Sequence, residues 1–227
     1  MNRAAFLSAL QGKRVGHILA DLRAELKVNS VLETIDADQL RACQERYKTP
    51  DLLAGSGKYL DVRPWMKRKL TYFYLLGLDR TKPLNILDLG TGTGYFPYVC
   101  TLNGHTVVTI DLDSDPIYND ICQMLHIDRR TWRISKYEKL PDLGLRFDLV
   151  TAFMISFNNG ESPEKWGVGE WRFLLEDLAQ NHLRKNGRTF FTFNKNSNGT
   201  YHDDELRSFF LKSSASIFRN QVDMRSI

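Results

Sequence analysis

The chain has 227 residues, of which 42% are hydrophobic and 26% charged, as in an ordinary globular protein with room for one domain and an appendage. Its mean hydropathy of −0.36 argues against an integral membrane protein, and no apolar run approaches the ~20 residues needed to span a bilayer. The net charge of +4 is mild. The one basic cluster, Lys67-Arg68-Lys69, is interpreted as the solvated face of a helix rather than a nucleic-acid patch.

The cysteines, at positions 43, 100 and 122, are scattered and show neither C-x-x-C spacing nor nearby histidine pairs. This pattern disfavours a zinc site and a disulfide framework. We therefore expect no metal and reduced thiols in a cytoplasmic protein. The first ten residues are expected to begin an amphipathic helix rather than a signal peptide.

The N-terminal region predicts helices. Apolar positions over residues 3–27 follow helical spacing, with interruptions near Gly12 and Gly16. A second helix is expected to run to Tyr47, starting either at Ser30, which has capping-box spacing to Glu33, or at Asp36. A flexible break follows at residues 54–57. Residues 1–57 are thus predicted to form a helical extension or lid, and residues 58–227 a separate domain.

The second region alternates strands with helices. The expected elements are a helix at 64–76, a strand at 84–89, a helix at 95–103, a strand at 106–110, a helix at 116–126, short and long strands at 131–134 and 147–153, a helix at 170–185, a strand at 188–193, a helix after residue 203 and a β-pair around 219–220. Such alternation predicts an α/β fold, doubly wound, with a mostly parallel sheet and helices on both faces.

A glycine-rich stretch stands out at the end of the first predicted strand. Asp88 ends an apolar run, and glycines follow at positions 90, 92 and 94. Glycines let the backbone turn sharply and approach a ligand closely, and Pro97 suits the first turn of a helix. A strand, a glycine loop and a helix N-terminus together indicate a nucleotide-type site.

The spacing favours a particular kind of nucleotide. The dinucleotide pattern is G-x-G-x-x-G, whereas Gly94 comes one place early, and a pyrophosphate would be repelled by Asp88. A ligand with an ammonium group would be attracted instead. S-adenosylmethionine carries an ammonium, a sulfonium and no phosphate. The alternatives are a plain glycine turn and a nicotinamide dinucleotide site.

A second acidic residue supports this interpretation. The β-branched run at 106–110 ends in Asp111, which lies 17 residues beyond Gly94. In doubly wound folds an acid about 20 residues past the loop binds the ribose hydroxyls. Asp113 is the fallback, but we prefer helix capping before Pro116 for Asp113 and Asp115.

The stretch D-x-G-x-G-x-G at residues 88–94, with Asp111 and Phe147-Asp148-Leu149-Val150, resembles the class I S-adenosylmethionine-dependent methyltransferases over residues 58–227. The resemblance implies a Rossmann-like sheet of strand order 3-2-1-4-5-7-6 and S-adenosylmethionine as cofactor. The residues it places at the cofactor are Asp88, Gly90, Thr91, Gly92, Gly94, Asp111, Leu112, Tyr137, Glu138 and Phe153. Lys58 and Tyr59, beside the glycine break, are candidates for a lid over it.

The adenine site departs from the family pattern. Lys136 and Tyr137 stand where the family often has an acid and a small residue. Glu138 is then the candidate for the adenine amino group, and Tyr137 for stacking or a backbone N–H. The alternative is an exposed charged loop.

The acceptor is expected to lie after the fourth strand. Asn158 and Asn159 are candidates to bind an acceptor hydroxyl or amine, and the alternative is an Asn-Asn-Gly turn without function. Phe157, Trp166 and Trp171 could cover an acceptor or belong to the core. The [D/N/S]-P-P-[Y/F/W] motif of the amino DNA methyltransferases is missing, which sets base methylation of DNA aside.

These features predict a methyltransferase that acts on oxygen or nitrogen of a small-molecule acceptor. Proximity and alignment carry such a reaction, so a catalytic base is optional. The alternatives are a non-catalytic S-adenosylmethionine-binding or partner-binding protein and, less favoured, an NAD(P)-dependent oxidoreductase. Nucleic-acid or protein acceptors remain open, and no membrane partner is expected.

Overall fold

A computed structural model describes residues 3–48 and 55–225, with side chains from residue 14 onward. The described residues form two compact units that interleave along the chain. The helical unit comprises the residues up to Pro83 together with Gly92–Gly104 and Asp113–Asp128. The sheet unit comprises Leu84–Thr91, His105–Leu112 and the residues from Arg129 onward. The predicted domain boundary after residue 57 stays a prediction.

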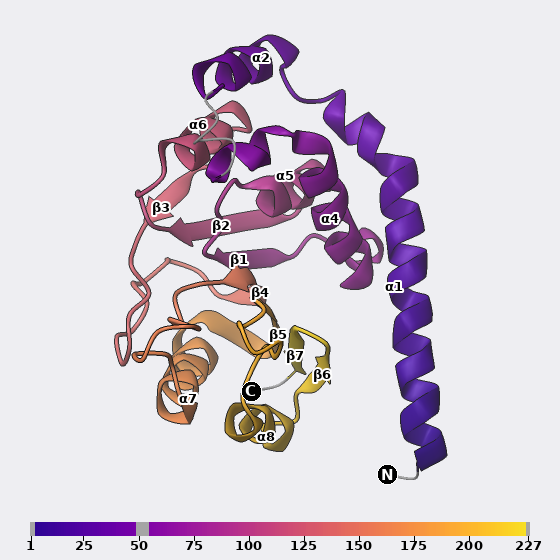
Figure 1. The fold of residues 1–227 in the computed structure, drawn as a ribbon, viewed down its shortest axis with the longest axis vertical. Coiled ribbons are helices and arrows are strands. Elements are labelled where there is room, and N and C mark those ends of the chain that lie inside the picture. Colours follow the sequence, from indigo (N-terminus) through magenta and orange to yellow (C-terminus); the bar gives the residue numbers. More distant parts are fainter. Residues whose placement is uncertain (1–2, 49–54, 226–227) are drawn as a thin grey trace. The chain divides into compact units, whose positions relative to one another are not determined.

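The sheet unit is built on seven strands in the order β3-β2-β1-β4-β5-β7-β6 (Figure 1). Their bounds are β1 Asn85–Leu89, β2 Thr106–Asp111, β3 Arg129–Thr131, β4 Phe147–Ile155, β5 Leu183–Phe193, β6 Ser216–Phe218 and β7 Gln221–Arg225. The first five strands are parallel, and β7 runs antiparallel to both β5 and β6. This arrangement confirms the predicted α/β class, the mostly parallel sheet and the strand order.

The central position of β1 explains its apolar sequence. Leu87 is aligned with Val108 of β2 on one side and Val150 of β4 on the other. A parallel strand with neighbours on both sides is buried and reads as a continuous apolar run. Ile86, Leu87 and Leu89 are accordingly inaccessible to solvent.

The helices of the sheet unit are α7 (Val168–Asp177), a single π-helical turn η3 (Leu178–His182) and α8 (Asp204–Lys212). The helix predicted for 170–185 therefore ends early, and β5 begins at Leu183, five residues before the strand predicted for 188–193. Residues 184–187 form an irregularity within β5, because the pairing of the strand with β4 passes from Leu183 directly to Arg188. Gly187 fits there because a Cβ would lie only 2.9 Å from the carbonyl oxygen of Arg184.

An aromatic cluster fills the core of the sheet unit around Trp171 of α7. The Trp171 ring is fully buried, and its centroid lies 5.3 to 5.8 Å from four other rings. These rings belong to Trp166, Phe191, Phe193 and Phe210. Aromatic side chains bury the largest apolar areas in a core, so Trp171 is expected to stabilise this unit strongly.

The helical unit contains α1 (Arg3–Leu32), α2 (Ala37–Arg46), η1 (Ser56–Leu60), α4 (Val62–Leu75), η2 (Leu78–Arg80), α5 (Tyr95–Leu102) and α6 (Pro116–Met124). The structure differs from two expectations for the N-terminal helices: the interruption near Gly16 and the start of the second helix at Ser30. Helix α1 continues through Gly16, and Ser30 lies within it, so the second helix does not start there. The alternative start is correct, because the Asp36 carboxylate caps α2 by accepting from the backbone N–H of Asp38 and Gln39.

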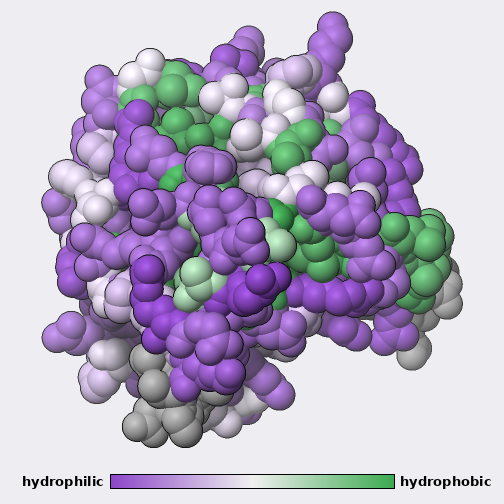
Figure 2. Space-filling model, turned by 90° about the horizontal axis from the view of Figure 1, so that it is seen from above, coloured by the Kyte–Doolittle hydropathy of each residue, from purple (hydrophilic) through white to green (hydrophobic). Residues whose placement is uncertain are grey.

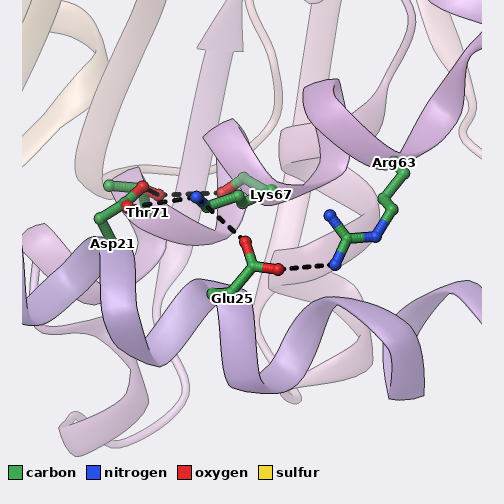
Figure 3. Close-up of polar contacts among 5 residues, drawn as sticks. All are labelled: Asp21, Glu25, Arg63, Lys67 and Thr71. Atoms are coloured by element: carbon green, nitrogen blue, oxygen red, sulfur yellow. Dashed lines mark hydrogen bonds and ion pairs between the residues drawn. The ribbon is translucent and has the colours of Figure 1, made fainter.

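Helix α1 packs along α4, and ion pairs flank the contact (Figure 3). Lys67 Nζ lies 3.1 Å from Asp21 and 3.0 Å from Glu25, and Arg63 lies 2.7 Å from Glu25. Both cations lower the pKa of Glu25, Arg63 more than Lys67. The Lys67-Arg68-Lys69 cluster is thus on a helix, as predicted, and Lys67 pairs with acids of α1 instead of facing only water.

The surface in Figure 2 is mostly hydrophilic, with hydrophobic side chains in several patches. On α1, the large exposed hydrophobic side chains follow helical spacing; they are Val15, Ile18, Leu19, Leu22 and Leu26. In the described part of the chain no helix has both the length and the apolar character needed to cross a membrane.

Candidate functional site

The loop after β1 turns sharply at its glycines. Gly90, Gly92 and Gly94 all adopt the left-handed conformation, with φ of 67°, 58° and 74°. The Gly90 N–H donates to the carbonyl oxygen of Ile110 in β2 at 2.8 Å, and the Thr91 N–H donates to the same oxygen at 3.3 Å. Because other residues adopt φ near +60° much less readily than glycine, the alternate glycines favour this turn.

Asp88, in β1, forms a hydrogen bond with the start of the loop at Thr91. Its carboxylate is buried (1% exposed). Thr91 Oγ1 donates to Oδ2 at 2.5 Å and Thr151 Oγ1 donates to Oδ1 at 2.6 Å. Burying a carboxyl group is costly unless it is hydrogen-bonded, so these two hydroxyls stabilise Asp88 in its buried position. Thr151 was missed by sequence reasoning because only the β1–β4 register, which aligns it with Asp88, brings it there.

Asp111 lies at the carboxyl end of β2, next to the start of the glycine loop. It directly follows Ile110, whose carbonyl oxygen accepts from the loop. The Leu112 N–H donates to Asp111 Oδ1 at 2.7 Å, which fixes the side chain. The side chain is only partly buried, so a ligand can reach it.

Asp113 and Asp115, which follow β2, belong to the helical unit and form hydrogen bonds with α6. Asp115 caps the helix by accepting from the Ile117 N–H at 2.9 Å, with Pro116 at the first helical position. Asp113 accepts from the side-chain amide of Asn119 instead. The capping interpretation is therefore right for Asp115, whereas Asp113 holds a side chain of the helix.

The second half of the glycine loop is supported inside the helical unit. The Cys122 thiol of α6 donates to the carbonyl oxygen of Gly92 at 3.3 Å, and a Cβ on Gly94 would lie 3.0 Å from the same sulfur. Tyr95, the first residue of α5, donates its hydroxyl to the carbonyl oxygen of Tyr59 at 2.6 Å. The segment with the lid candidates Lys58 and Tyr59 is thus attached next to the loop.

The adenine candidates lie between β3 and β4. Tyr137 has a left-handed φ of 55°, and its hydroxyl contacts α7, where a Cβ on Gly169 would lie only 2.6 Å from it. Desolvation, with the Glu170 carboxylate close by, raises the pKa of Tyr137. Glu170 caps α7 by accepting from the Gly167 N–H at 3.0 Å. Glu138 is exposed. The adenine roles of Tyr137 and Glu138 stay predictions.

The end of β4 is irregular. Its pairing with β5 shifts between Ala152 and Ile155, and Met154 in that shift has a φ of 53° and is 42% exposed. Thr192 Oγ1 accepts from its N–H at 2.7 Å and Asn194 donates to its carbonyl at 2.9 Å. Bulges and positive φ at non-glycine residues cluster at functional sites. Sequence could not show this, because methionine carries no signal for positive φ.

Phe153, the cofactor candidate that precedes this bulge, points inward. It is 8% exposed, and its ring centroid lies 6.0 Å from that of Phe190 in β5. Its direct contact with a cofactor stays a prediction.

The two asparagines that follow β4 differ in environment. Asn159 has a φ of 52° and donates its N–H to Ser156, as in the turn considered for it. Asn158 is only 8% exposed, and no donor within the described chain reaches its Oδ1. An unsatisfied buried polar group costs about 1–3 kcal/mol. Asn158 is therefore the stronger candidate to meet a donor group of an acceptor.

The three aromatic candidates for acceptor binding form one cluster. The Phe157 ring centroid lies 5.4 Å from that of Trp166 and 6.1 Å from that of Trp171. Trp166 is 2% exposed and Trp171, which lies on α7 rather than on a loop, is fully buried. Trp171 thus fits the core alternative, and only the partly buried Phe157 retains an exposed surface.

No metal centre is expected from the cysteine and histidine spacing. Within the described residues, no group of three or more histidine, cysteine, aspartate and glutamate side chains is arranged to hold a metal ion. All three cysteines are buried thiols.

The chain was compared with family models and with curated proteins. No family model matches the chain. A curated relative, the ribosomal protein L11 methyltransferase of Lactobacillus helveticus, is 24% identical over 149 residues, which are 63% of this chain. The chain covers only 40% of that relative's length.

Solved structures of methyltransferases are similar to this chain. Magnesium protoporphyrin IX methyltransferase from Synechocystis PCC 6803, with bound SAH, is 14% identical and matches with a TM-score of 0.50 over 76% of this chain and 87% of its own. The ribosomal protein L11 methylase of Lactobacillus delbrueckii subsp. bulgaricus is 18% identical, with a TM-score of 0.43 over 70% and 78% of the two chains. Together with the strand order and the glycine loop, the Synechocystis match identifies the fold of this chain as the class I, Rossmann-like methyltransferase fold.

Proposed function

We propose that this chain is an S-adenosylmethionine-dependent methyltransferase that methylates oxygen or nitrogen of a small-molecule acceptor. One observation carries the proposal. Three left-handed glycines follow β1, with Asp88 buried below them and Asp111 at the end of the neighbouring strand. This geometry suits a nucleoside without phosphates better than a pyrophosphate, which the Asp88 carboxylate would repel.

The residues present fit this cofactor. A Cβ on Gly90 would meet no atom within 4 Å, so the space over this glycine is open to a ligand. Asp111 is positioned to accept hydrogen bonds from ribose hydroxyls, as acids at this place do in doubly wound folds. When bound, S-adenosylmethionine supplies an electrophilic methyl group, and the protein needs mainly to align the nucleophile.

The acceptor would then lie near the ends of β4 and β5. Asn158 offers a buried carbonyl oxygen without a donor, and the bulge at Met154 exposes an apolar side chain. Holding the acceptor in line with the methyl group can lower the barrier by about 7–11 kcal/mol, even without a general base.

A protein acceptor is the second candidate. It is favoured by the name of the curated relative, a ribosomal protein L11 methyltransferase. The two candidates differ in the product that carries the methyl group, so they can be separated directly.

Binding measurements test whether S-adenosylmethionine is the cofactor. We expect Asp111→Ala to lower the affinity for S-adenosylmethionine about ten- to a hundredfold, because each hydrogen bond to a charged group contributes about 1.5–3 kcal/mol. Asp113→Ala is the matched control, since Asp113 bonds to Asn119 and should leave binding unchanged. Calorimetry measures both. Equal affinities of wild type and Asp111→Ala would contradict the proposed site, and tighter binding of NAD(P) would favour the oxidoreductase.

Turnover measurements test whether the protein transfers the methyl group and to which class of acceptor. The protein is incubated with methyl-labelled S-adenosylmethionine and either a metabolite panel or a ribosomal protein fraction. Label in small molecules supports the primary proposal, and label in protein supports the second candidate. Cofactor binding without methyl transfer to either class would favour a non-catalytic binding protein.

A further inference from the structure

Helix α1 of the helical unit has two apolar faces. One lies on the side that packs along α4 and is at most 5% exposed; it consists of Ala20, Ala24, Val28 and Val31. The other, which we call the α1 stripe, is 54% to 86% exposed; it consists of Val15, Ile18, Leu19, Leu22 and Leu26. Leu22 and Ala24 point in nearly opposite directions, because two residues are about 200° apart around an α-helix. The contact with α4 therefore leaves the α1 stripe open.

The spacing within the α1 stripe is that of a seam between two helices. Val15, Leu19, Leu22 and Leu26 are separated by four, three and four residues, which is the a/d repeat of paired helices. The seam covers about three turns, or ~17 Å of helix. Contiguous exposed apolar side chains of this kind mark an interaction site rather than ordinary surface.

The residues around the α1 stripe argue against a lipid surface as its partner. Asp21 and Glu25 lie on one flank, where they pair with cations of α4 (Figure 3). An anionic membrane attracts Lys and Arg and repels such acids. The side chains described for α1 also include no phenylalanine, tyrosine or tryptophan, which interfacial helices use as anchors. A second protein helix fits the stripe better.

The α1 stripe is complementary to itself in the antiparallel direction. Leu19 and Leu22 lie at equal distances from the midpoint between residues 20 and 21, and so do Val15 and Leu26. In an antiparallel pair of α1 helices, Leu19 of each copy therefore meets Leu22 of the other. Val15 likewise meets Leu26, so every position of the seam meets an apolar side chain. A two-fold dimer requires this property, because both copies use the same surface.

Charges beside the α1 stripe favour the same orientation. Arg14 lies on the Glu25 side of the stripe, is exposed and forms no ion pair within the described residues. The antiparallel register brings Arg14 of one copy to within about 3 Å of Glu25 of the other along the helix axis. A parallel pair would instead place each of these charges against its own kind. On the other flank, Asp79 neutralises Arg23 at 2.5 Å.

We propose that this protein forms a homodimer in which the α1 stripes of two copies pack antiparallel. The proposal goes beyond the proposed function, because no residue of the stripe belongs to the candidate functional site. The contact is short, so we expect a weak dimer at the low end of stable interfaces.

Sedimentation equilibrium of the full chain from about 1 to about 100 μM tests the dimer. We expect wild type to dimerise as its concentration rises. Leu22→Glu should raise the dissociation constant at least about a hundredfold, because each dimer loses two buried leucines. Leu211→Glu in α8 is the matched control, since Leu211 is 49% exposed and Leu22 is 55% exposed. This control should dimerise like wild type.

A mixture of two variants tests the antiparallel register. Leu19→Lys and Leu22→Glu should each weaken the homodimer, because each places a charge opposite a leucine in two layers of the seam. Mixed in equal amounts, they should form a heterodimer in which one layer pairs lysine with glutamate and the other pairs leucine with leucine. A parallel register predicts no such rescue, because residue 19 would then face residue 19.

The remaining outcomes overturn the proposal. A wild type that stays monomeric over the whole range refutes the dimer, and so does a dimer that Leu22→Glu and Leu211→Glu weaken equally. Co-sedimentation of a monomeric wild type with vesicles of phosphatidylcholine and phosphatidylglycerol, lost in Leu22→Glu, would assign the stripe to a membrane. Restored association of the two variants only in the parallel sense, with no rescue in the mixture, refutes the antiparallel pairing. None of these results alters the proposed function, because cofactor binding is measured separately.

Discussion

At the scale of single residues, Asp88 shows how a buried carboxyl group organises the start of the glycine loop. Both of its carboxylate oxygens accept from threonine hydroxyls, one in the loop and one in β4. A hydrogen bond to a charged group contributes about 1.5–3 kcal/mol, more than one between neutral groups. The conformation of the loop therefore depends on Thr151 as well as on the glycines.

Replacing Thr151 with valine tests this dependence. The change keeps the shape of the side chain but leaves one Asp88 oxygen without its donor, so we expect a loss of about 1–3 kcal/mol in the free energy of unfolding. Thr189→Val in β5 is the matched control, because the Thr189 hydroxyl is equally buried and has no hydrogen-bond partner within the described chain. That change should be neutral or stabilising. Urea denaturation measures both, and equal losses would contradict the role of Thr151.

At the scale of elements, helix α6 depends on its first residues. The Asp115 carboxylate accepts from the Ile117 N–H, and Pro116 at the first helical position has no N–H that would need an acceptor. The helix in turn supports Gly92 and Gly94 through Cys122. A change at the cap is thus expected to reach the glycine loop.

Removal of the cap tests how much the Asp115 side chain contributes to stability. Asp115→Ala should lower the free energy of unfolding by about 1 kcal/mol, whereas Asp115→Asn, which keeps a capping side chain, should lose much less. Urea denaturation followed by circular dichroism gives both values. Identical effects of the two substitutions would show that the side-chain cap contributes little.

At the scale of the whole molecule, the free energy of unfolding should depend on pH through buried histidines. Burial lowers the pKa of His182 below 6.5, although Asp177 beside it opposes the shift. Burial also lowers the pKa of His202. Below 6.5 the unfolded chain takes up protons that the folded chain excludes, so the free energy of unfolding falls as the pH falls.

His182→Gln tests this linkage. The variant should lose less stability than wild type when the pH is lowered from about 7 to about 5.5. It lacks a histidine that binds a proton more readily in the unfolded chain than in the folded chain. Urea denaturation across this range gives the slope. An unchanged slope would mean that His182 does not titrate differently in the folded and unfolded chains.

The sequence alone was sufficient for features that depend on residues a few positions apart. The turn at glycines 90, 92 and 94, the cap at Asp115 and the strand–helix alternation follow from local propensity and spacing. The resemblance carried by residues 88–94 also led to the correct strand order, including the antiparallel edge. Local sequence could not show where the helix after residue 168 would end, because the pairing of β5 with β4 decides that boundary.

The tertiary structure decided which distant side chains meet. The register of β1 with β4 brings Thr151 to Asp88, the bulge beside β5 turns Met154 outward, and the packing of η1 brings Tyr59 to Tyr95. Each contact joins residues that lie more than thirty positions apart in the chain. Local propensity carries no information about such pairs, because they form only when strands and helices pack in one particular register.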